Sequence, residues 1–232
     1  MSGAPTEGTL ALLHTSPVHV PVFEALRDAS RPGLGLQHFV AEDLLLRARE
    51  RGPEDVADAV RALIGEAVGA GADAVLCTCS TLGVVAERAA AQVGVPVLRV
   101  DRPMAAAAVA AGPRIVVVAA VESTLEPTVA LIRQEAAGRA VEVVARVVDG
   151  AWERFEAGDT EGYAQAVAAG VDGVVDADVI VLAQASMTVA RHLVTTALPV
   201  LASPESGFAA AAEAAARAAA AAAPGNAGRS LP

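Results

Sequence analysis

The sequence predicts an α/β protein made of two similar doubly wound halves, each with a flavodoxin-like or Rossmann-like parallel sheet. Short apolar runs alternate along the chain with segments of helical periodicity. Two strand patterns also recur at one offset of 105 residues, since Leu10 aligns with Ile115 and Asp73 with Asp178. A Pro-Val-Leu run follows later in each copy. These repeats indicate an internal duplication, with the halves related by a pseudo-twofold axis and a site in the cleft between them.

The first half is expected to contain four strands with helices between them. Apolar runs bounded by turn residues predict strands, and apolar residues at helical spacing predict helices. Pro53 suits the first turn of one of these helices. The expected strands are 9–14, 34–40, 74–77 and 95–100, and the expected helices are 20–29, 53–68, 82–92 and one that opens at 101–103.

The second half is expected to repeat this order and to be followed by one long helix. Thr160 is the expected N-cap of a helix that ends near Val175. The helix from Glu205 through the alanine tract is expected to pack back on the first half, which gives domains of 1–101 plus 204–232 and of 102–203, with 224–232 a frayed tail. The other expected elements are strands 114–119, 141–148, 177–183 and one at 198–201, with helices at 125–135 and after 186.

The composition narrows the function classes. A net charge of −10 argues against nucleic-acid binding, because no basic stripe is present to neutralise phosphates. No membrane helix and no signal peptide are expected, so a cytoplasmic protein is predicted, and a homo-oligomer stays open. The four histidines are scattered and the two cysteines lie one residue apart, which favours neither a metal site nor a disulfide.

The strongest candidate site is the end of the strand that carries both cysteines. Ligands of open α/β sheets bind at the carboxyl ends of the strands. Cys79 is followed there by the hydroxyls of Ser80 and Thr81, a combination of one nucleophile or base with two hydrogen-bonding groups. Cys77 lies deeper in the strand and is expected to be a packing residue. The offset of 105 places Gln184, Ala185 and Ser186 in the corresponding loop of the other half.

These two loops resemble the paired motifs of the aspartate/glutamate/hydantoin racemase superfamily, which includes arylmalonate decarboxylase and maleate isomerase. Its first motif, Cys-Asn-Thr, is matched by Cys79-Ser80-Thr81, and its second, Gly-Cys-Thr, by the segment 183–186. The resemblance implies an amino-acid racemase-like isomerase that acts without a cofactor next to the carboxylate of a small acid or amino acid. It further implies that Cys79 is the base or nucleophile.

The resemblance also implies which side chains hold the carboxylate of the substrate. Hydroxyls and backbone N–H groups of the two loops are expected to bind it, with help from loops that end the first strand of each half. Helix capping is the alternative role for Ser16 and Thr124, and core packing is the alternative for His14. For Gln184 the alternative is a hydrogen bond to the loop backbone. The expected substrate-binding residues are His14, Ser16, Ser80, Thr81, Ser123, Thr124, Gln184, Ala185 and Ser186.

The sequence departs from the family at Gln184, which stands where the second cysteine is expected. Because glutamine is neither an acid nor a base, three reactions remain open. One is single-cysteine decarboxylation or cis–trans isomerisation, although family decarboxylases keep the other cysteine. The second is racemisation with His14 or His192 as the substitute acid, and the third is nucleophilic attack by Cys79. A catalytically silent carboxylate-binding relative is the non-enzymatic alternative.

Overall fold

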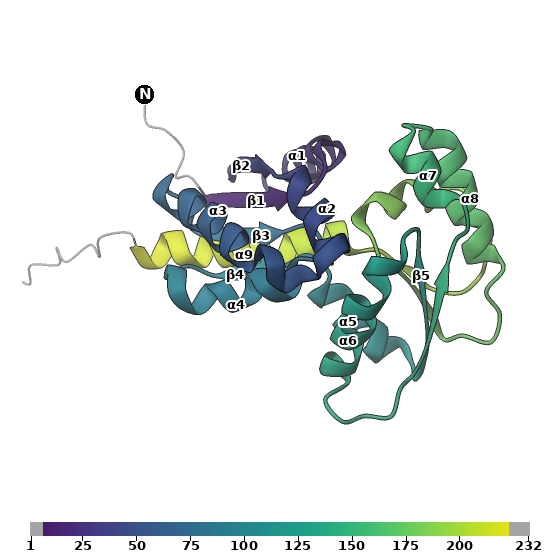
Figure 1. Ribbon diagram of the computed structural model, residues 1–232. Coiled ribbons are helices and arrows are strands. Elements are labelled where there is room, and N and C mark those ends of the chain that lie inside the picture. Colours follow the sequence, from purple (N-terminus) through teal and green to yellow (C-terminus); the bar gives the residue numbers. More distant parts are fainter. Residues whose placement is uncertain (1–6, 223–232) are drawn as a thin grey trace, which may run out of the picture.

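A computed structural model describes residues 7–222 and contains two four-stranded parallel sheets (Figure 1). The strand orders are β2-β1-β3-β4 and β6-β5-β7-β8, so the second sheet repeats the topology of the first. Helices flank both sheets, which confirms the predicted α/β fold of two similar halves. The predicted tail at 224–232 lies outside the described residues.

The first half carries its four strands in the chain order β1, β2, β3 and β4. Its elements are β1 (Thr9–His14), α1 (Val20–Ser30), β2 (Gly35–Val40), α2 (Glu42–Arg51), α3 (Ala57–Gly69), β3 (Ala74–Cys77), α4 (Gly83–Val93) and β4 (Val97–Arg99).

The second half repeats this order, and a long helix, α9 (Ser203–Ala222), follows it in the chain. The elements of the second half are α5 (Arg102–Ala111), β5 (Arg114–Ala119), α6 (Leu125–Ala136), β6 (Glu142–Val147), α7 (Ala151–Glu156), α8 (Thr160–Asp172), β7 (Val179–Leu182) and β8 (Val200–Leu201).

The strand registers show the duplication directly. Leu10 of β1 pairs with Ala74 of β3, and Ile115 of β5 pairs with Val179 of β7. Both partners of the second pair lie 105 residues after those of the first, the offset found in the sequence. Equivalent strand ends therefore carry equivalent loops, and these loops are the ones that contain Cys79 and Gln184.

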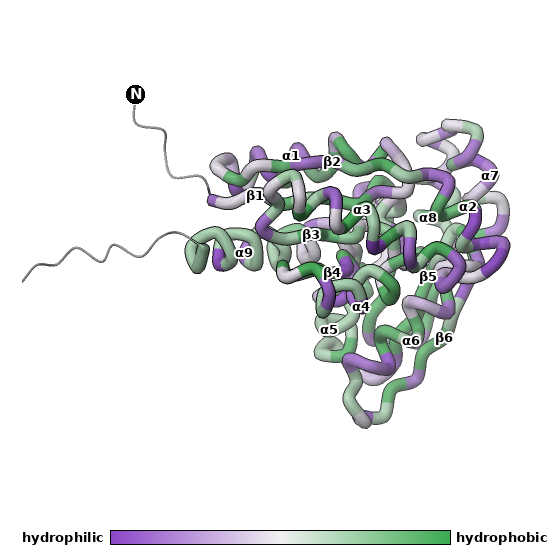
Figure 2. Tube along the Cα trace, turned by 60° about the vertical axis from the view of Figure 1, so that its left-hand side comes forward, coloured by the Kyte–Doolittle hydropathy of each residue, from purple (hydrophilic) through white to green (hydrophobic). Residues whose placement is uncertain are grey.

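Small aliphatic side chains fill the core on both faces of each sheet. In the first half, Leu10 and Leu12 pack toward α9, whereas Leu13 and Val75 belong to the cluster on the opposite face. This alternation is the period of two that a strand buried on both faces shows. In Figure 2, hydrophobic segments follow β5 and its neighbours, and the alanine-rich α9 is mostly pale green.

Helix α9 returns to the first half, where it packs against β1, β3, β4 and α1 (Figure 1). The approach is close at Gly207, because a Cβ atom there would lie 2.3 Å from the carbonyl oxygen of Val100. Phe208, in the next position, is 2% exposed and packs near Phe23 with ring centroids 6.3 Å apart. Gly207 thus allows the helix to lie directly on the chain after β4.

The structure differs from the sequence predictions at several elements. Helices α2 and α7 were not predicted. Asp159, not Thr160, is the N-cap of α8, because its carboxylate accepts the N–H of Gly162 at 2.9 Å. The second motif is followed by a 3-10 helix (Ala185–Ala190) instead of an α-helix. After this 3-10 helix, the N–H groups of Thr195 and Thr196 donate to the Asp172 carboxylate. These bonds hold the chain there in an irregular conformation.

Candidate active site

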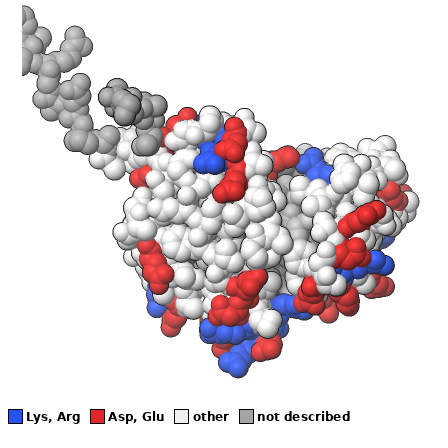
Figure 3. Space-filling view, turned by 90° about the horizontal axis from the view of Figure 1, so that it is seen from above, with Lys and Arg blue, Asp and Glu red and all other residues white. Residues whose placement is uncertain are grey.

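A cavity of about 200 Å³ lies between the two halves, at the carboxyl ends of strands from both sheets. Seen from above, the surface is hollowed between the two lobes (Figure 3). Loops after β1, β3, β5 and β7 form its floor, and α2 and α7 form its upper walls. The expected site residues that line this cavity are Ser16, Cys79, Ser80, Thr81, Thr124, Gln184, Ala185 and Ser186.

Cys79 contributes a buried thiol to this cavity and is 9% exposed. Burial raises the pKa of the Cys79 thiol, because the thiolate loses its hydration. Hydrogen bonds from the Thr15 hydroxyl and from the backbone N–H groups of Leu82 and Thr81 partly offset this rise. Cys79 is therefore a protonated thiol at neutral pH that faces donors able to stabilise its thiolate.

Cys77 is fully buried and does not line the cavity. Its Sγ atom donates to the carbonyl oxygen of Cys79 at 3.5 Å. Burial raises the pKa of Cys77 strongly, and the nearby Cys79 raises it further. Cys77 therefore packs behind the loop, and of the two thiols only Cys79 reaches the cavity.

A buried ion pair supports the loop of Cys79 from below. Arg99 and Asp101 are 3% and 0% exposed, and the guanidinium donates to the carboxylate at 2.6 and 2.8 Å. The same guanidinium lies 3.4 Å from the carbonyl oxygen of Ser80. Gly83 is required above it, since a Cβ atom there would lie 2.7 Å from Nε of Arg99. The Cys79 loop is thus held in place by an ion pair whose side chains do not line the cavity.

The second motif presents an amide where the first presents a thiol. Gln184 is 9% exposed, and its Oε1 atom accepts the N–H of Ala120 at 2.6 Å. Ser186 shares a hydrogen bond of 2.8 Å with the hydroxyl of Tyr163. Burial raises the pKa of Tyr163 to about 12, so this phenol stays neutral. Gln184 is neither an acid nor a base, and Tyr163 does not line the cavity, so the second motif presents no counterpart to the Cys79 thiol.

His14 lies behind the cavity instead of lining it. Its Nδ1 is 2.9 Å from the hydroxyl of Thr78, and its Nε2 is 2.9 Å from Nδ1 of His38. Burial lowers the pKa of His14 to about 3, helped by the neighbouring His19 and His38. His19 lines the cavity, and burial lowers its pKa to about 4. His192 is exposed and outside the lining.

The remaining candidates divide between cavity and core. Ser16 and Thr124 stand at helix N-caps, but neither side chain makes a capping hydrogen bond. Ser123 does not line the cavity, and its buried hydroxyl makes no hydrogen bond with the described residues. Sequence reasoning missed a group of lining residues on and around the two helices: Glu42, Leu45, Leu46, Arg49, Trp152, Phe155 and Glu156. Trp152, the only tryptophan of the chain, was the one available signal.

The described residues show neither a candidate metal site nor a helix that could span a membrane. Within 7–222, no group of three or more His, Cys, Asp or Glu side chains is placed to hold a metal ion. Over the same range, each helix is too short or too polar to cross a bilayer.

Comparison with known proteins gives one family and a consistent set of folds. The model of the family "Asp/Glu/Hydantoin racemase" matches residues 20–215. Aspartate racemase of Picrophilus torridus is 14% identical with a TM-score of 0.65, covering 92% of this chain and 94% of its own. Glutamate racemase of Francisella tularensis in complex with D-glutamate is 12% identical with a TM-score of 0.66, covering 88% and 80%. Arylmalonate decarboxylase is 18% identical with a TM-score of 0.52, covering 90% and 93%. No curated protein sequence matches this chain.

Proposed function

Because the chain belongs to the Asp/Glu/hydantoin racemase family, we propose that it is an enzyme that acts at the carbon next to the carboxylate of a small acid or amino acid. Cys79 is the reacting group in this proposal. The observation that carries it is a single thiol in a cavity between two halves, facing the loop of Gln184.

The cavity offers a set of neutral donors to the substrate carboxylate. Ser16 and Thr124 line it without capping their helices, which leaves both hydroxyls to a ligand. Thr81 and Ser186 add hydroxyls from the two motif loops. Donors fixed by a rigid loop stabilise the negative charge that develops on this carboxylate when the adjacent carbon becomes carbanionic.

The state of Cys79 favours a reaction that delivers a proton to one face of that carbon. A thiol with a raised pKa holds its proton at neutral pH and can give it to a carbanion. In a decarboxylation, the bond to the leaving carboxylate breaks and CO₂ departs. The electron pair enters the enediolate of the remaining carboxylate, and the Cys79 proton then goes to carbon. Solvent returns a proton to the sulfur, so no cofactor takes part.

Reversible proton exchange on one face is the second candidate reaction. It requires a Cys79 thiolate as base, and the donors from Thr15, Thr81 and Leu82 favour that thiolate. Racemisation needs an acid on the opposite face as well. Gln184 cannot supply it, and His14 and His192 lie outside the cavity lining. His19 lines the cavity, but burial lowers its pKa to about 4, so its imidazole carries no proton to donate as an imidazolium at neutral pH.

Reactions in heavy water separate these outcomes. The protein is incubated in D₂O with malonate derivatives and with single enantiomers of small α-substituted acids, and the products are followed by NMR and chiral chromatography. Decarboxylation gives a product with one deuterium and one configuration, whereas one-face exchange gives deuterium with retained configuration. Equal amounts of both enantiomers would refute the single-face chemistry, and no reaction with any of these acids would refute the proposed activity.

A further inference from the structure

Two short helices at equivalent positions of the two halves form an apolar wall over the cavity. Helix α2 follows β2 and contributes Leu45 and Leu46, and α7 follows β6 and contributes Trp152 and Phe155. Leu44 and Ala48 are the buried residues of α2. Leu45 packs partly against the same core and also lines the cavity, whereas Leu46 is not part of that core. Leu46 is 56% exposed and lines the cavity, so its side chain is open to contact with a ligand.

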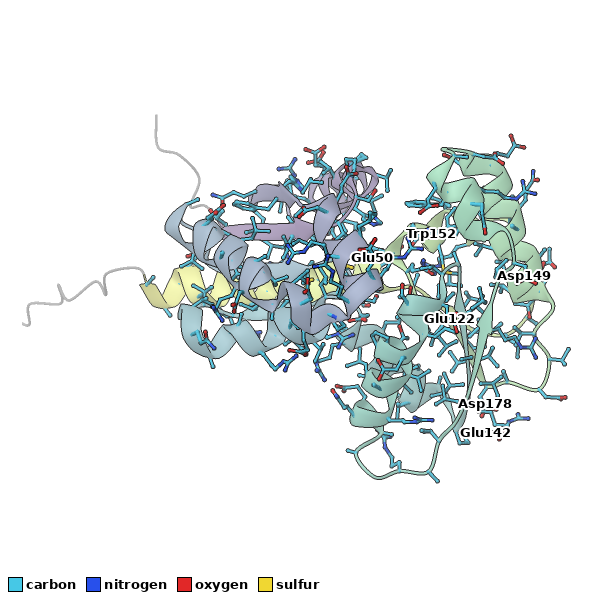
Figure 4. All side chains as sticks on the ribbon, in the orientation of Figure 1. Glu50, Glu122, Glu142, Asp149, Trp152 and Asp178 are labelled. Atoms are coloured by element: carbon cyan, nitrogen blue, oxygen red, sulfur yellow. The ribbon has the colours of Figure 1, made fainter. Side chains whose placement is uncertain are left out.

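The aromatic part of the wall is held rigidly against the second motif. The rings of Trp152 and Phe155 stack with centroids 5.0 Å apart, and Phe155 lies 5.3 Å from the ring of Tyr163. The hydroxyl of Tyr163 binds that of Ser186 at the cavity floor. Figure 4 shows Trp152 on the side of the second half that faces the first. A ligand held by the floor therefore extends toward a preformed apolar surface.

The charges of the lining around α2 and α7 do not suit a carboxylate on the substituent of the reacting carbon. Among the described residues that line the cavity, Arg49 is the only Arg or Lys. Glu156 accepts from it at 3.4 Å, and its guanidinium carbon lies 5.1 Å from the ring centroid of Trp152. Glu42 and Glu156 also line the cavity, so the acidic side chains outnumber the basic one. A carboxylate on the substrate side chain would meet repulsion from both acids and a cation that is already paired.

We propose that the substituent on the reacting carbon is an apolar group, held by Leu45, Leu46, Trp152 and Phe155, and that acids with a carboxylate on this substituent are rejected. This inference rests on the proposed function, which assigns the residues that bind the carboxylate and the reacting carbon. It adds the residues that bind the substituent on that carbon. Burial of an isopropyl-sized group against this wall stabilises the complex, because apolar surface is removed from water.

Calorimetric titration of the intact protein with two acids of matched shape tests this inference without requiring turnover. In 4-methylpentanoate an isopropyl group occupies the place of the distal carboxylate of succinate. We expect 4-methylpentanoate to bind at least about tenfold more tightly, the ratio that corresponds to about 1.4 kcal/mol. Tighter binding of succinate would overturn the inference and leave the proposed function standing. Failure of both acids to bind would count against the proposed function as well.

A pair of leucine variants locates the effect. Leu46→Ser should weaken 4-methylpentanoate about fivefold or more and leave succinate unchanged, because it removes apolar contact only. Leu193→Ser replaces a leucine that is 38% exposed and does not line the cavity, so it should change neither affinity. Equal effects of the two variants on 4-methylpentanoate, or no effect of Leu46→Ser, would contradict the assigned role of the wall.

Discussion

The hydroxyl of Ser80 donates a hydrogen bond of 2.9 Å to the carbonyl oxygen of Ala183, joining two loops that lie 103 residues apart. Ser80 directly follows Cys79, and Ala183 directly precedes Gln184. The bond therefore ties the two motif loops together across the pseudo-twofold axis. It fixes how far the thiol lies from the amide on the opposite side of the cavity.

Replacing Ser80 with Ala should lower both stability and activity. The loss of a buried hydrogen bond costs about 1 kcal/mol, and the freed loops should reduce kcat/KM about tenfold or more. Thr188→Ala is the matched control, because the Thr188 hydroxyl donates at 2.9 Å to the carbonyl oxygen of Ala185 within the same 3-10 helix and joins no second loop. Urea unfolding should show similar losses for both variants. A kcat/KM of the Ser80 variant equal to that of the control would contradict a role for this bond in catalysis.

Replacing Arg99 with Met should destabilise the protein by about 3–5 kcal/mol, because it leaves the Asp101 carboxylate buried without its partner. The double variant Arg99→Met, Asp101→Asn removes the orphaned charge and should recover part of this loss. Urea unfolding of both variants measures the difference. A single variant that loses less than about 1 kcal/mol would show that this pair is not required under the Cys79 loop.

Replacing Gly207 with Ala should destabilise the first half, because the new Cβ would overlap the Val100 carbonyl oxygen at 2.3 Å. The expected cost is about 1–3 kcal/mol, as for other overpacked sites. Gly65→Ala in α3 is the control, since a Cβ atom there would have no neighbour within 4 Å and Ala favours a helix by about 1 kcal/mol. The midpoint temperature of thermal unfolding should therefore fall for Gly207→Ala and rise for Gly65→Ala. A neutral Gly207 variant would argue against close docking of α9.

Acid should destabilise the protein through His14 and His19. An unfolded histidine binds a proton near pH 6.5, whereas the buried side chains have pKa values of about 3 and about 4. The unfolded state binds more protons in this window, so stability is lost as pH falls below 6.5, by up to about 1.4 kcal/mol per pH unit for each histidine.

Unfolding free energies of His14→Gln, measured between pH 7 and pH 4.5, test this account. The variant should show a shallower loss of stability with falling pH, because one buried neutral imidazole is gone. His192→Gln, at an exposed position, is the control and should follow the wild-type slope. Parallel slopes for all three proteins would rule out His14 as a source of acid sensitivity.

The duplication made most of the fold predictable from the sequence. A fixed offset identifies equivalent strands, and equivalent strands of parallel sheets carry equivalent loops at one edge, so Cys79 and Gln184 could be placed in opposing loops. The same reasoning identified Ser16 and Thr124 as residues of this edge. It also placed His14 there, whereas the imidazole turns into the core between Thr78 and His38.

The upper walls could not be predicted, because their periodicity is weak. In α2 three leucines stand in succession, which marks no single face, and only the structure shows that Leu44 packs inward while Leu46 is exposed. Helix α7 has 6 residues, too few for a helical period to be recognised. The two helices come from separate halves and meet through Arg49, whose guanidinium carbon lies 5.1 Å from the ring centroid of Trp152. Strand and helix patterns do not encode such a contact.

Turnover of cysteine variants tests the central claim most directly. With a substrate identified in heavy water, Cys79→Ser should reduce kcat by at least about a thousandfold while the unfolding temperature stays near that of the wild type. Cys77→Ala, which changes the thiol outside the cavity, should cost about 1 kcal/mol of stability and keep most of the activity. A Cys79 variant that turns over as fast as the Cys77 variant would contradict the account.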